Sequence, residues 1–259
     1  RIIAGMKKTL YLIGIGPGGP EYLTMQAIEA LRTIDCFFML EKEGRGKDEL
    51  IAARQAILAR YLPDANPRIA TRASPPRRMD TDGYREGVEQ WHARKRVLIA
   101  EMIEQELAAG ERGAFLIWGD PSLYDQTVSL VSELVAESPD QLELVVIPGI
   151  TAVQALTAAH RIPVNRIGES ITITTGRAIA QQDPAAIHNS VVMLDNNAEF
   201  QHFNGQELDV YWGAYLGCGD QAIAAGPVDA VRDELLERRA RLREEHGWIM
   251  DTYLLRRRR

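Results

Sequence analysis

The segment Thr9–Ile15 constrains the fold of this chain more than any other feature. It reads TLYLIGI, a short and almost continuously apolar run, and it ends in the glycine-rich loop Gly14–Gly19. A strand without alternation of polar and apolar residues is buried on both faces, as in a parallel sheet that helices cover from either side. We therefore expect an α/β fold built around this strand.

Further strands and helices alternate along the rest of the chain. The predicted strands after the first are 36–40, 68–71, 113–118, 142–147, 170–174, 190–194, 210–216 and 248–255, and the predicted helices are 24–35, 47–61, 84–107, 123–137, 151–159 and 228–245. This alternation favours mainly parallel α/β architecture, with enough strands for two sheets. The break at Pro148-Gly149 separates an N-terminal α/β domain, 6–147, from a C-terminal α/β domain, 148–259.

The composition excludes several classes of protein. With 46% hydrophobic and 25% charged residues, the chain is not of the disordered, collagen-like or disulfide-framework type. Its net charge of -6, from 30 basic and 36 acidic residues, argues against a broad nucleic-acid-binding surface. No uncharged apolar run reaches the roughly 18 residues of a membrane span. We therefore expect no nucleic-acid partner and no membrane association.

Neither the cysteines nor the histidines have the spacing of a metal site. Cys36 and Cys218 stand far apart, so that we expect no metal and a location in the reducing cytoplasm. The charged run within 228–245 is interpreted as a solvated helix face, and Arg256–Arg259 as a frayed end. Residues 1–5 precede Met6, a more natural start, and are left out of the fold prediction.

Three loops that follow predicted strands are candidate ligand sites, because ligands of parallel sheets bind at the carboxyl ends of strands. The first, Gly14–Gly19, matches GxGxxG, which alone suggests a nicotinamide-dependent dehydrogenase with Glu41 on the ribose. Pro17 and Pro20, however, interrupt the segment in which the helix of a dinucleotide fold should begin. The loop therefore favours another ligand over a dinucleotide.

The other two loops are 118–124 and 148–153. Asp120, between Gly and Pro, can accept hydrogen bonds from a ligand amine, but it can equally cap the next helix. Thr151 is a predicted N-cap whose small neighbours would let a ligand approach the backbone closely. Each loop by itself is compatible with a ligand site or with an ordinary turn.

In combination, the three loops resemble those of the tetrapyrrole methylase family. The chain has GxGPG after its first strand, GDP after a later strand and PGIT at the domain boundary, and the resemblance covers nearly the whole chain. It implies two α/β domains with S-adenosylmethionine bound in a cleft between them. It also implies S-adenosylhomocysteine as a product and a homodimer as the assembly.

Longer segments are similar to one branch of this family, which methylates precorrin-5 at C-1 and releases its acetyl group as acetate in cobalamin biosynthesis. These segments are KDEL at 47–50, RIPVNRIGE at 161–169, ITTG at 173–176, VVMLD at 191–195, YWGAYLG at 211–217 and GWIMDTYLLR at 247–256. The resemblance thus implies a precorrin, a tetrapyrrole, as the substrate. Methylation of another precorrin and a non-catalytic tetrapyrrole carrier are the alternatives.

The resemblance also assigns the contacts with the cofactor. They fall on Pro17, Trp118, Gly119, Asp120, Leu123, Thr151, Ala152, Asp195 and Leu216. Asp195 stands where relatives usually have Met, and Leu216 where they often have Gly, so that main-chain contacts are expected at both. Methyl transfer mainly needs alignment of the reacting atoms and exclusion of water, which fits a chain without a catalytic triad.

Candidate substrate-binding and catalytic residues follow from the chemistry of the reaction. The peripheral carboxylates of a precorrin require cationic partners, to which Arg is well suited. The substrate-binding candidates are Arg72, Arg77, Arg78 and Tyr124. Loss of acetate requires water to add to the acetyl carbonyl, which a general base assists. The candidate bases are Glu41, Asp125 and His92, of which Glu41 is expected to be partly desolvated.

Overall fold

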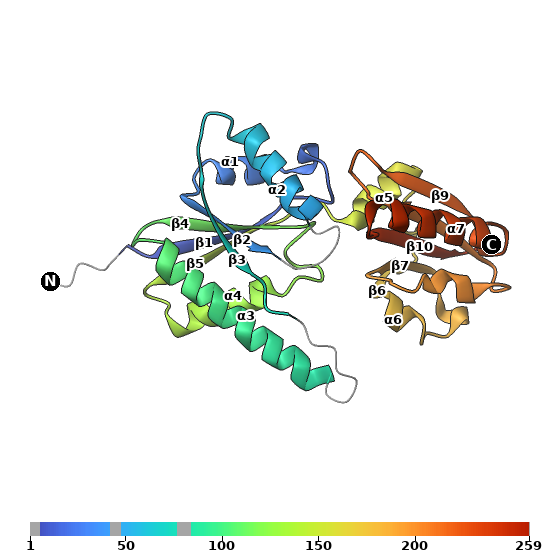
Figure 1. Ribbon diagram of the computed structural model, residues 1–259. Coiled ribbons are helices and arrows are strands. Elements are labelled where there is room, and N and C mark those ends of the chain that lie inside the picture. Colours follow the sequence, from blue (N-terminus) through green and yellow to red (C-terminus); the bar gives the residue numbers. More distant parts are fainter. Residues whose placement is uncertain (1–5, 42–47, 77–83, 259) are drawn as a thin grey trace. The chain divides into compact units, whose positions relative to one another are not determined.

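The computed structural model describes residues 6–41, 48–76 and 84–258, which form two compact units (Figure 1). The first unit contains residues 6–16 and 20–150, and the second contains 17–19 and 151–258. Each unit has its own five-stranded sheet. The predicted α/β fold with two sheets is confirmed.

The sheet of the first unit is parallel throughout, as its buried first strand predicts. Its strands are β1 (Lys8–Gly14), β2 (Cys36–Glu41), β3 (Arg68–Ala73), β4 (Arg112–Ile117) and β5 (Leu142–Ile147). They follow the order β3-β2-β4-β1-β5, so that β1 and β4 are interior strands. Leu10, Leu12 and Ile13 of β1 are completely buried.

Helices cover both faces of this sheet (Figure 1). α1 (Met25–Leu31) and α2 (Asp48–Tyr61) lie on one face, and α3 (Tyr84–Glu106) and α4 (Thr127–Glu137) lie on the other. Successive residues of a strand point to opposite faces. Phe37 of β2 accordingly belongs to the same core cluster as Ile57 of α2, whereas Phe38 belongs to a second cluster with Ile99 of α3.

Helix α4 begins at Thr127, not at Leu123 as predicted. The residues between them form a turn, in which the backbone N–H of Leu123 donates to the carbonyl of Asp120 and Tyr124 has a φ of 54°. A residue with a left-handed φ interrupts a right-handed helix. The helix starts after Asp125, whose carboxylate accepts a hydrogen bond from the backbone N–H of Thr127 at 2.7 Å.

The sheet of the second unit is mixed, so the prediction of mainly parallel strands is wrong there. Its strands are β6 (Thr172–Thr175), β7 (Asn189–Met193), β8 (Leu208–Ala214), β9 (Ala222–Pro227) and β10 (Asp251–Arg257), in the order β6-β7-β10-β8-β9. Only the β6–β7 pair is parallel. The chain passes from β8 to β9 through residues 215–221, which are too few for a crossover to a parallel neighbour.

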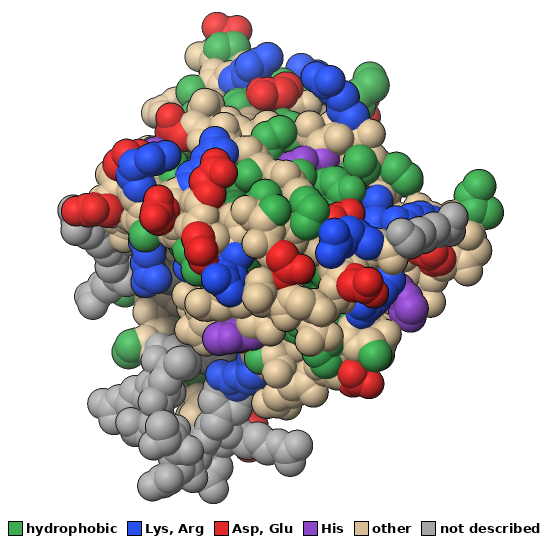
Figure 2. Space-filling model, turned by 90° about the vertical axis from the view of Figure 1, so that its right-hand side faces the viewer, with side chains coloured by type: hydrophobic (Ala, Val, Ile, Leu, Met, Phe, Trp, Pro, Cys, Tyr) green, Lys and Arg blue, Asp and Glu red, His purple; other side chains and the backbone are tan. Residues whose placement is uncertain are grey.

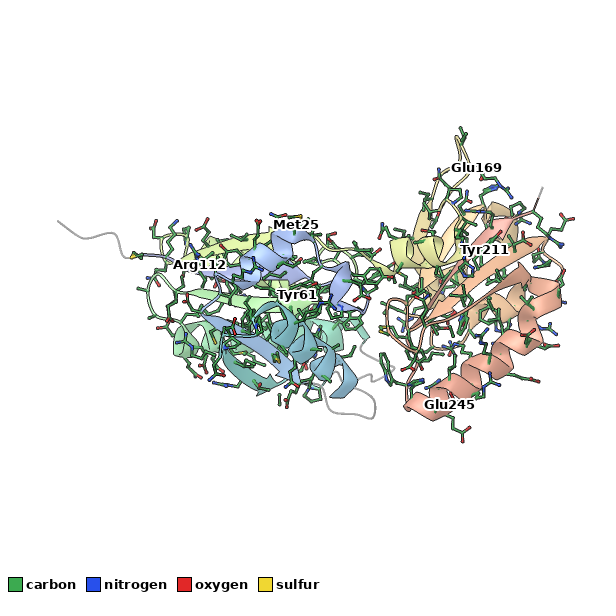
Figure 3. The ribbon with its side chains drawn as sticks, turned by 90° about the horizontal axis from the view of Figure 1, so that it is seen from above. Met25, Tyr61, Arg112, Glu169, Tyr211 and Glu245 are labelled. Atoms are coloured by element: carbon green, nitrogen blue, oxygen red, sulfur yellow. The ribbon has the colours of Figure 1, made fainter. Side chains whose placement is uncertain are left out.

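Three helices complete the second unit. They are α5 (Ala152–His160), α6 (Gly176–Ile179) and α7 (Val228–His246). Figure 3 shows Tyr211 within the sheet and Glu245 on the outer side of α7. On the face shown in Figure 2, basic and acidic side chains are interspersed. None of the helices in the described parts of the chain has the length and apolar character needed to cross a membrane.

The inner side of α7 carries a buried Arg, which departs from the expected solvated face. Arg239 is 7% exposed, and its Nε donates to the carboxylate of Asp251 on β10 at 2.9 Å. The indole of Trp212 donates to the same carboxylate at 2.8 Å. An ion pair out of water is kept only when both partners are well hydrogen-bonded. These bonds hold α7 to the middle of the sheet.

Arg256 and Arg257 are part of β10, so the prediction of a frayed end is wrong for these two residues. Arg256 is 5% exposed and donates from Nε to the side-chain oxygen of Asn189 at 3.0 Å. The backbone N–H of Arg257 donates to the carbonyl of His188 at 3.0 Å. The run of four arginines suggested a solvated end of the chain, but the pairing of β10 with β7 places Arg256 next to the buried Asn189.

Replacing Arg239 tests the buried ion pair. We expect Arg239→Met to lower the free energy of unfolding by about 3–5 kcal/mol, because the carboxylate of Asp251 then stays buried without its cation. Arg241→Met is the matched control two residues along α7, where an exposed Arg lies 3.9 Å from Glu245, and it should change stability by less than about 1 kcal/mol. Urea unfolding of both variants measures the difference. Equal losses would contradict the assignment.

Candidate functional site

The three loops singled out in the sequence meet through their glycines in the first unit. A Cβ atom added to Gly14 would lie 2.6 Å from the backbone nitrogen of Gly149 and 2.9 Å from the carbonyl oxygen of Gly119. One added to Gly149 would lie 2.1 Å from that same oxygen. Contacts this short leave no room for a side chain. The carboxyl ends of β1, β4 and β5 therefore present closely packed backbone.

Backbone hydrogen bonds reinforce the meeting of the first two loops. The N–H of Gly119 donates to the carbonyl of Gly16 at 2.8 Å, and the N–H of Gly16 donates back to the carbonyl of Gly119 at 3.2 Å. Both residues have positive φ, 79° at Gly16 and 67° at Gly119, which glycine adopts without strain. The glycines of GxGPG and GDP are thus required by the conformation of the unit itself.

Asp120 joins the second loop to the third. Its carboxylate accepts hydrogen bonds from the backbone N–H of Gly149 at 2.8 Å and from the backbone N–H and the hydroxyl of Ser122. Burial raises the pKa of this carboxyl, but the hydrogen bonds from Ser122 and Gly149 outweigh it, so the pKa lies below its ordinary value. Asp120 is not the cap of α4, whose N-cap is Gln126. The ionised carboxylate holds two glycine loops together.

Three further predicted residues lie on the second loop. Trp118 is half-buried at the end of β4, and the guanidinium carbon of Arg54 lies 6.0 Å from the centre of its ring. Leu123 is half-buried in the turn before α4, and Tyr124 is 44% exposed. The structure thus brings Trp118, Asp120 and Leu123 to one edge of the parallel sheet.

The first loop also contributes to the second unit, through Pro17–Gly19. A Cβ atom added to Gly18 would lie 2.6 Å from the sulfur of Cys218 and 2.9 Å from the carbonyl oxygen of Leu216. Of the predicted cofactor residues, Leu216 therefore takes part in the close contact with Gly18, and Pro17 is the residue before Gly18.

Thr151 is the N-cap of α5, as predicted. Its hydroxyl accepts a hydrogen bond from the backbone N–H of Val153 at 3.1 Å, and the side chain of Gln154 accepts one from the backbone N–H of Thr151 at 3.0 Å. This reciprocal pattern is a capping box. Ala152 is the first residue of the helix and is half-buried.

The side chain of Asp195 is occupied by the protein. The carboxylate is 6% exposed and accepts hydrogen bonds from the backbone N–H groups of Asn197 and Glu199 and from the hydroxyl of Tyr253 at 2.7 Å. Burial and the charge of Asp195 raise the pKa of Tyr253, which stays protonated as a donor. The preceding residue, Leu194, has a φ of 52° and is 65% exposed. Any contact of this turn with a ligand is therefore made by other groups.

The three candidate bases lie in different surroundings. Glu41 is the last residue of β2 and is exposed, so the expected desolvation of its carboxylate is wrong. The buried part of β2 ends at Met39, and the chain leaves the core before Glu41. Asp125 is half-buried in the turn before α4, where its carboxylate accepts a hydrogen bond from the backbone N–H of Thr127. His92 is half-buried on α3, with its ring centre 5.3 Å from that of Trp91. The three bases thus lie on three different segments, namely the end of β2, the turn before α4, and α3.

Of the three candidate substrate-binding arginines, only Arg72 lies within the described residues. Arg72 forms an ion pair with Glu106 at 2.7 Å and donates to the side chain of Gln105 at 3.3 Å. Arg77 and Arg78 lie outside the described residues. One cation that the sequence analysis did not single out, Arg54, lies next to Trp118. Among the residues described here, no three His, Cys, Asp or Glu side chains are arranged to hold a metal ion.

Comparisons with known proteins identify the family. The family model of tetrapyrrole (corrin/porphyrin) methylases matches residues 9–232. The chain belongs to this family. The resemblance seen in the three glycine loops is confirmed, and with it the prediction of a methyltransferase.

Among the relatives of this tetrapyrrole methylase is a precorrin-6A synthase [deacetylating] from Sinorhizobium sp, 45% identical over 253 residues, 98% of this chain and 96% of that protein. The crystal structure of a cobalamin synthesis related protein (CobF) from Corynebacterium diphtheriae is 38% identical, with a TM-score of 0.80 over 96% of this chain and 98% of that one. A uroporphyrin-III C-methyl transferase from Thermus thermophilus, crystallised with S-adenyl homocysteine, shares the fold with a TM-score of 0.60 over 96% of this chain and 97% of that one, at 16% identity.

The close approach of the glycines in this methylase can be tested by one added methyl group. We expect Gly149→Ala to lower the free energy of unfolding by about 1–3 kcal/mol, because its Cβ would overlap the carbonyl of Gly119. Gly219→Ala is the control, since a Cβ there has no atom within 4 Å. Chemical denaturation of both variants measures the effect, and a fully stable Gly149→Ala would show that the loops separate easily.

Proposed function

We propose that this methyltransferase acts on precorrin-5, methylating C-1 with loss of the acetyl group as acetate to give precorrin-6A in cobalamin biosynthesis. The observation that carries the proposal is the identity of 45% with a precorrin-6A synthase [deacetylating] over 98% of the chain. The match extends through both units of the chain. It therefore includes the second unit, which carries most of the longer segments that are similar to the branch acting on precorrin-5. Another precorrin methylation is the alternative.

We further propose S-adenosylmethionine as the methyl donor and S-adenosylhomocysteine as the product. When bound, the donor supplies a methyl group on a sulfonium, which is already a strong electrophile. The protein then has to align the accepting carbon and exclude water, for which closely packed glycine backbone is suited. The proposed contacts are Pro17, Trp118, Gly119, Asp120, Leu123, Thr151, Ala152, Asp195 and Leu216.

The structure refines what each proposed cofactor residue can offer. The carboxylate of Asp120 already accepts from Gly149 and Ser122, and that of Asp195 accepts from Tyr253. Neither acid is a free acceptor for a ligand, although a carboxylate oxygen can accept more than one hydrogen bond. We therefore propose that Asp195 acts through the main chain that it holds in place.

A methyl-transfer assay tests the proposed reaction. We expect the chain to incorporate labelled methyl from S-adenosylmethionine into precorrin-5 and to release acetate in equal amount. A tetrapyrrole carrier would bind the coloured substrate without consuming S-adenosylmethionine. A dehydrogenase would instead bind a nicotinamide cofactor in equilibrium measurements. Methylation without acetate would favour another precorrin reaction.

Deacetylation is expected to need a general base that methyl transfer does not. We propose Glu41 for this role, ahead of Asp125 and His92, because it is the last residue of β2, at the carboxyl edge of the parallel sheet. Glu41→Gln should slow acetate release by about 10²–10⁴-fold while methyl incorporation is retained. Single-turnover measurement of both products gives the answer, with Glu29→Gln, an exposed acid on α1, as the control. If both steps fall together, or neither falls, Glu41 is not this base.

We propose a homodimer from the family resemblance, and a cytoplasmic location because Cys36 and Cys218, far apart in the sequence, form no disulfide in the described structure. We expect light scattering at micromolar concentration to give twice the chain mass of 28.9 kDa. A mass that stays at that of one chain over the whole concentration range would contradict the dimer.

A further inference from the structure

Strands β2 and β4 separate at their carboxyl ends. They pair only from Cys36 to Phe38, opposite 113–115, although β2 runs on to Glu41 and β4 to Ile117. The β1–β4 pairing, in contrast, continues to the end of both strands. We call this opening the β2–β4 fork. It leaves the carbonyl of Leu116 without a partner strand on the β2 side.

The β2–β4 fork is also the point at which the chain connections diverge. From β2 the chain proceeds through α2 to β3, on one side of the sheet order, and from β4 through α4 to β5, on the other side. The two helices lie on opposite faces of the sheet (Figure 1). In open α/β sheets, ligands bind in the crevice outside such a switch point. The fork is therefore where the topology of the first unit predicts a ligand.

One cation reaches into the fork. Arg54 lies on α2, the helix that ends at Tyr61 (Figure 3), and its Nε donates to the carbonyl of Leu116 at 2.9 Å. Its Nη1 donates to the carbonyl of Leu50 at 2.9 Å. The guanidinium also lies 6.0 Å from the ring centre of Trp118, at the end of β4. Arg54 thus occupies the place that a longer β2–β4 pairing would fill.

The guanidinium of Arg54 has hydrogen-bonding capacity to spare. It carries five N–H groups, of which backbone carbonyls accept two. Within the described parts of the chain, no carboxylate forms an ion pair with it and nothing accepts from Nη2. Burial lowers the pKa of Arg54, opposed by the charge of Asp125 after β4. A half-buried cation that forms no ion pair with a carboxylate is costly, and a ligand carboxylate would offset that cost.

We propose that Arg54 binds a peripheral carboxylate of the tetrapyrrole at the β2–β4 fork. This inference rests on the proposed function, because it takes the substrate to be a precorrin. The planar guanidinium of Arg can donate two parallel hydrogen bonds to one carboxylate, whereas the ammonium group of Lys acts as a point charge. The β2 strand ends at Glu41 and β4 leads to Asp125, so a substrate held by Arg54 lies along the edge that carries two of the candidate bases.

Steady-state kinetics of two variants tests the assignment. Arg54→Gln should raise the KM for precorrin-5 by roughly tenfold or more, because a charge-assisted hydrogen bond is lost, while the KM for S-adenosylmethionine stays within about twofold. Arg54→Lys keeps the charge without the planar fork and should also raise the KM for precorrin-5, by a smaller factor. Arg60→Gln, which removes an exposed Arg on the same helix, is the control and should leave both constants unchanged.

Several outcomes would overturn the proposal. A folded Arg54→Gln with the wild-type KM for precorrin-5 would show that Arg54 only caps the carbonyl of Leu116. A rise confined to the KM for S-adenosylmethionine would assign the carboxylate to the methyl donor instead. If Arg54→Gln does not fold, Arg54→Lys decides in the same way. A wild-type chain that transfers no methyl group would contradict the proposed function, whereas an active wild type with unchanged variants contradicts only this inference.

Discussion

The first unit depends on the contact of three backbones at the carboxyl edge of its sheet. Gly14, Gly119 and Gly149 approach so closely that a methyl group on the first or the last of them would overlap neighbouring main chain. The loops after β1, β4 and β5 can meet only because these positions lack side chains. The same contact explains why Asp120 is ionised and bound on both sides, since its carboxylate satisfies backbone donors that the packing would otherwise strand. An edge of closely packed backbone suits methyl transfer, the step that depends on alignment rather than on acid–base groups.

The second unit obtains its order from buried polar groups instead. The carboxylate of Asp195 holds the turn after β7 and accepts a hydrogen bond from the hydroxyl of Tyr253 on β10. Arg239 donates a hydrogen bond to the backbone carbonyl of Asp195 at 2.6 Å. A Cβ atom on Gly176 would lie 2.6 Å from that carboxylate, so the start of α6 packs directly on it. In a low-dielectric interior such a network is strong when every member is satisfied and costly when one is removed. Asp195 is therefore tied to residues on three other elements, β10, α7 and α6.

The sequence predicted the parts of the fold that depend on local pattern. The buried strand Thr9–Ile15 and the N-cap at Thr151 follow from apolar runs and capping chemistry, and both are confirmed. The errors arose where pairing between strands decides. β9 reads AIAAGP, which has little β propensity, and becomes a strand only because β8 lies beside it. The burial of Arg256 is set by Asn189 in the same way.

Arg54 shows the limit of sequence analysis at the site itself. The helix 47–61 was predicted from apolar residues that include Leu50, Ile57 and Leu58, and Arg54 falls on the same stripe, four residues after the first and four before the last. A cation on an apolar stripe usually extends its head to water along its aliphatic stem. The alternative is that the guanidinium bonds to a buried acceptor from elsewhere in the chain. That acceptor is the carbonyl of Leu116, which is available to Arg54 only because β2 and β4 separate. The helical periodicity thus marks Arg54 as unusual, but only the register of two strands distant in sequence determines whether it is solvated or poised for an anion.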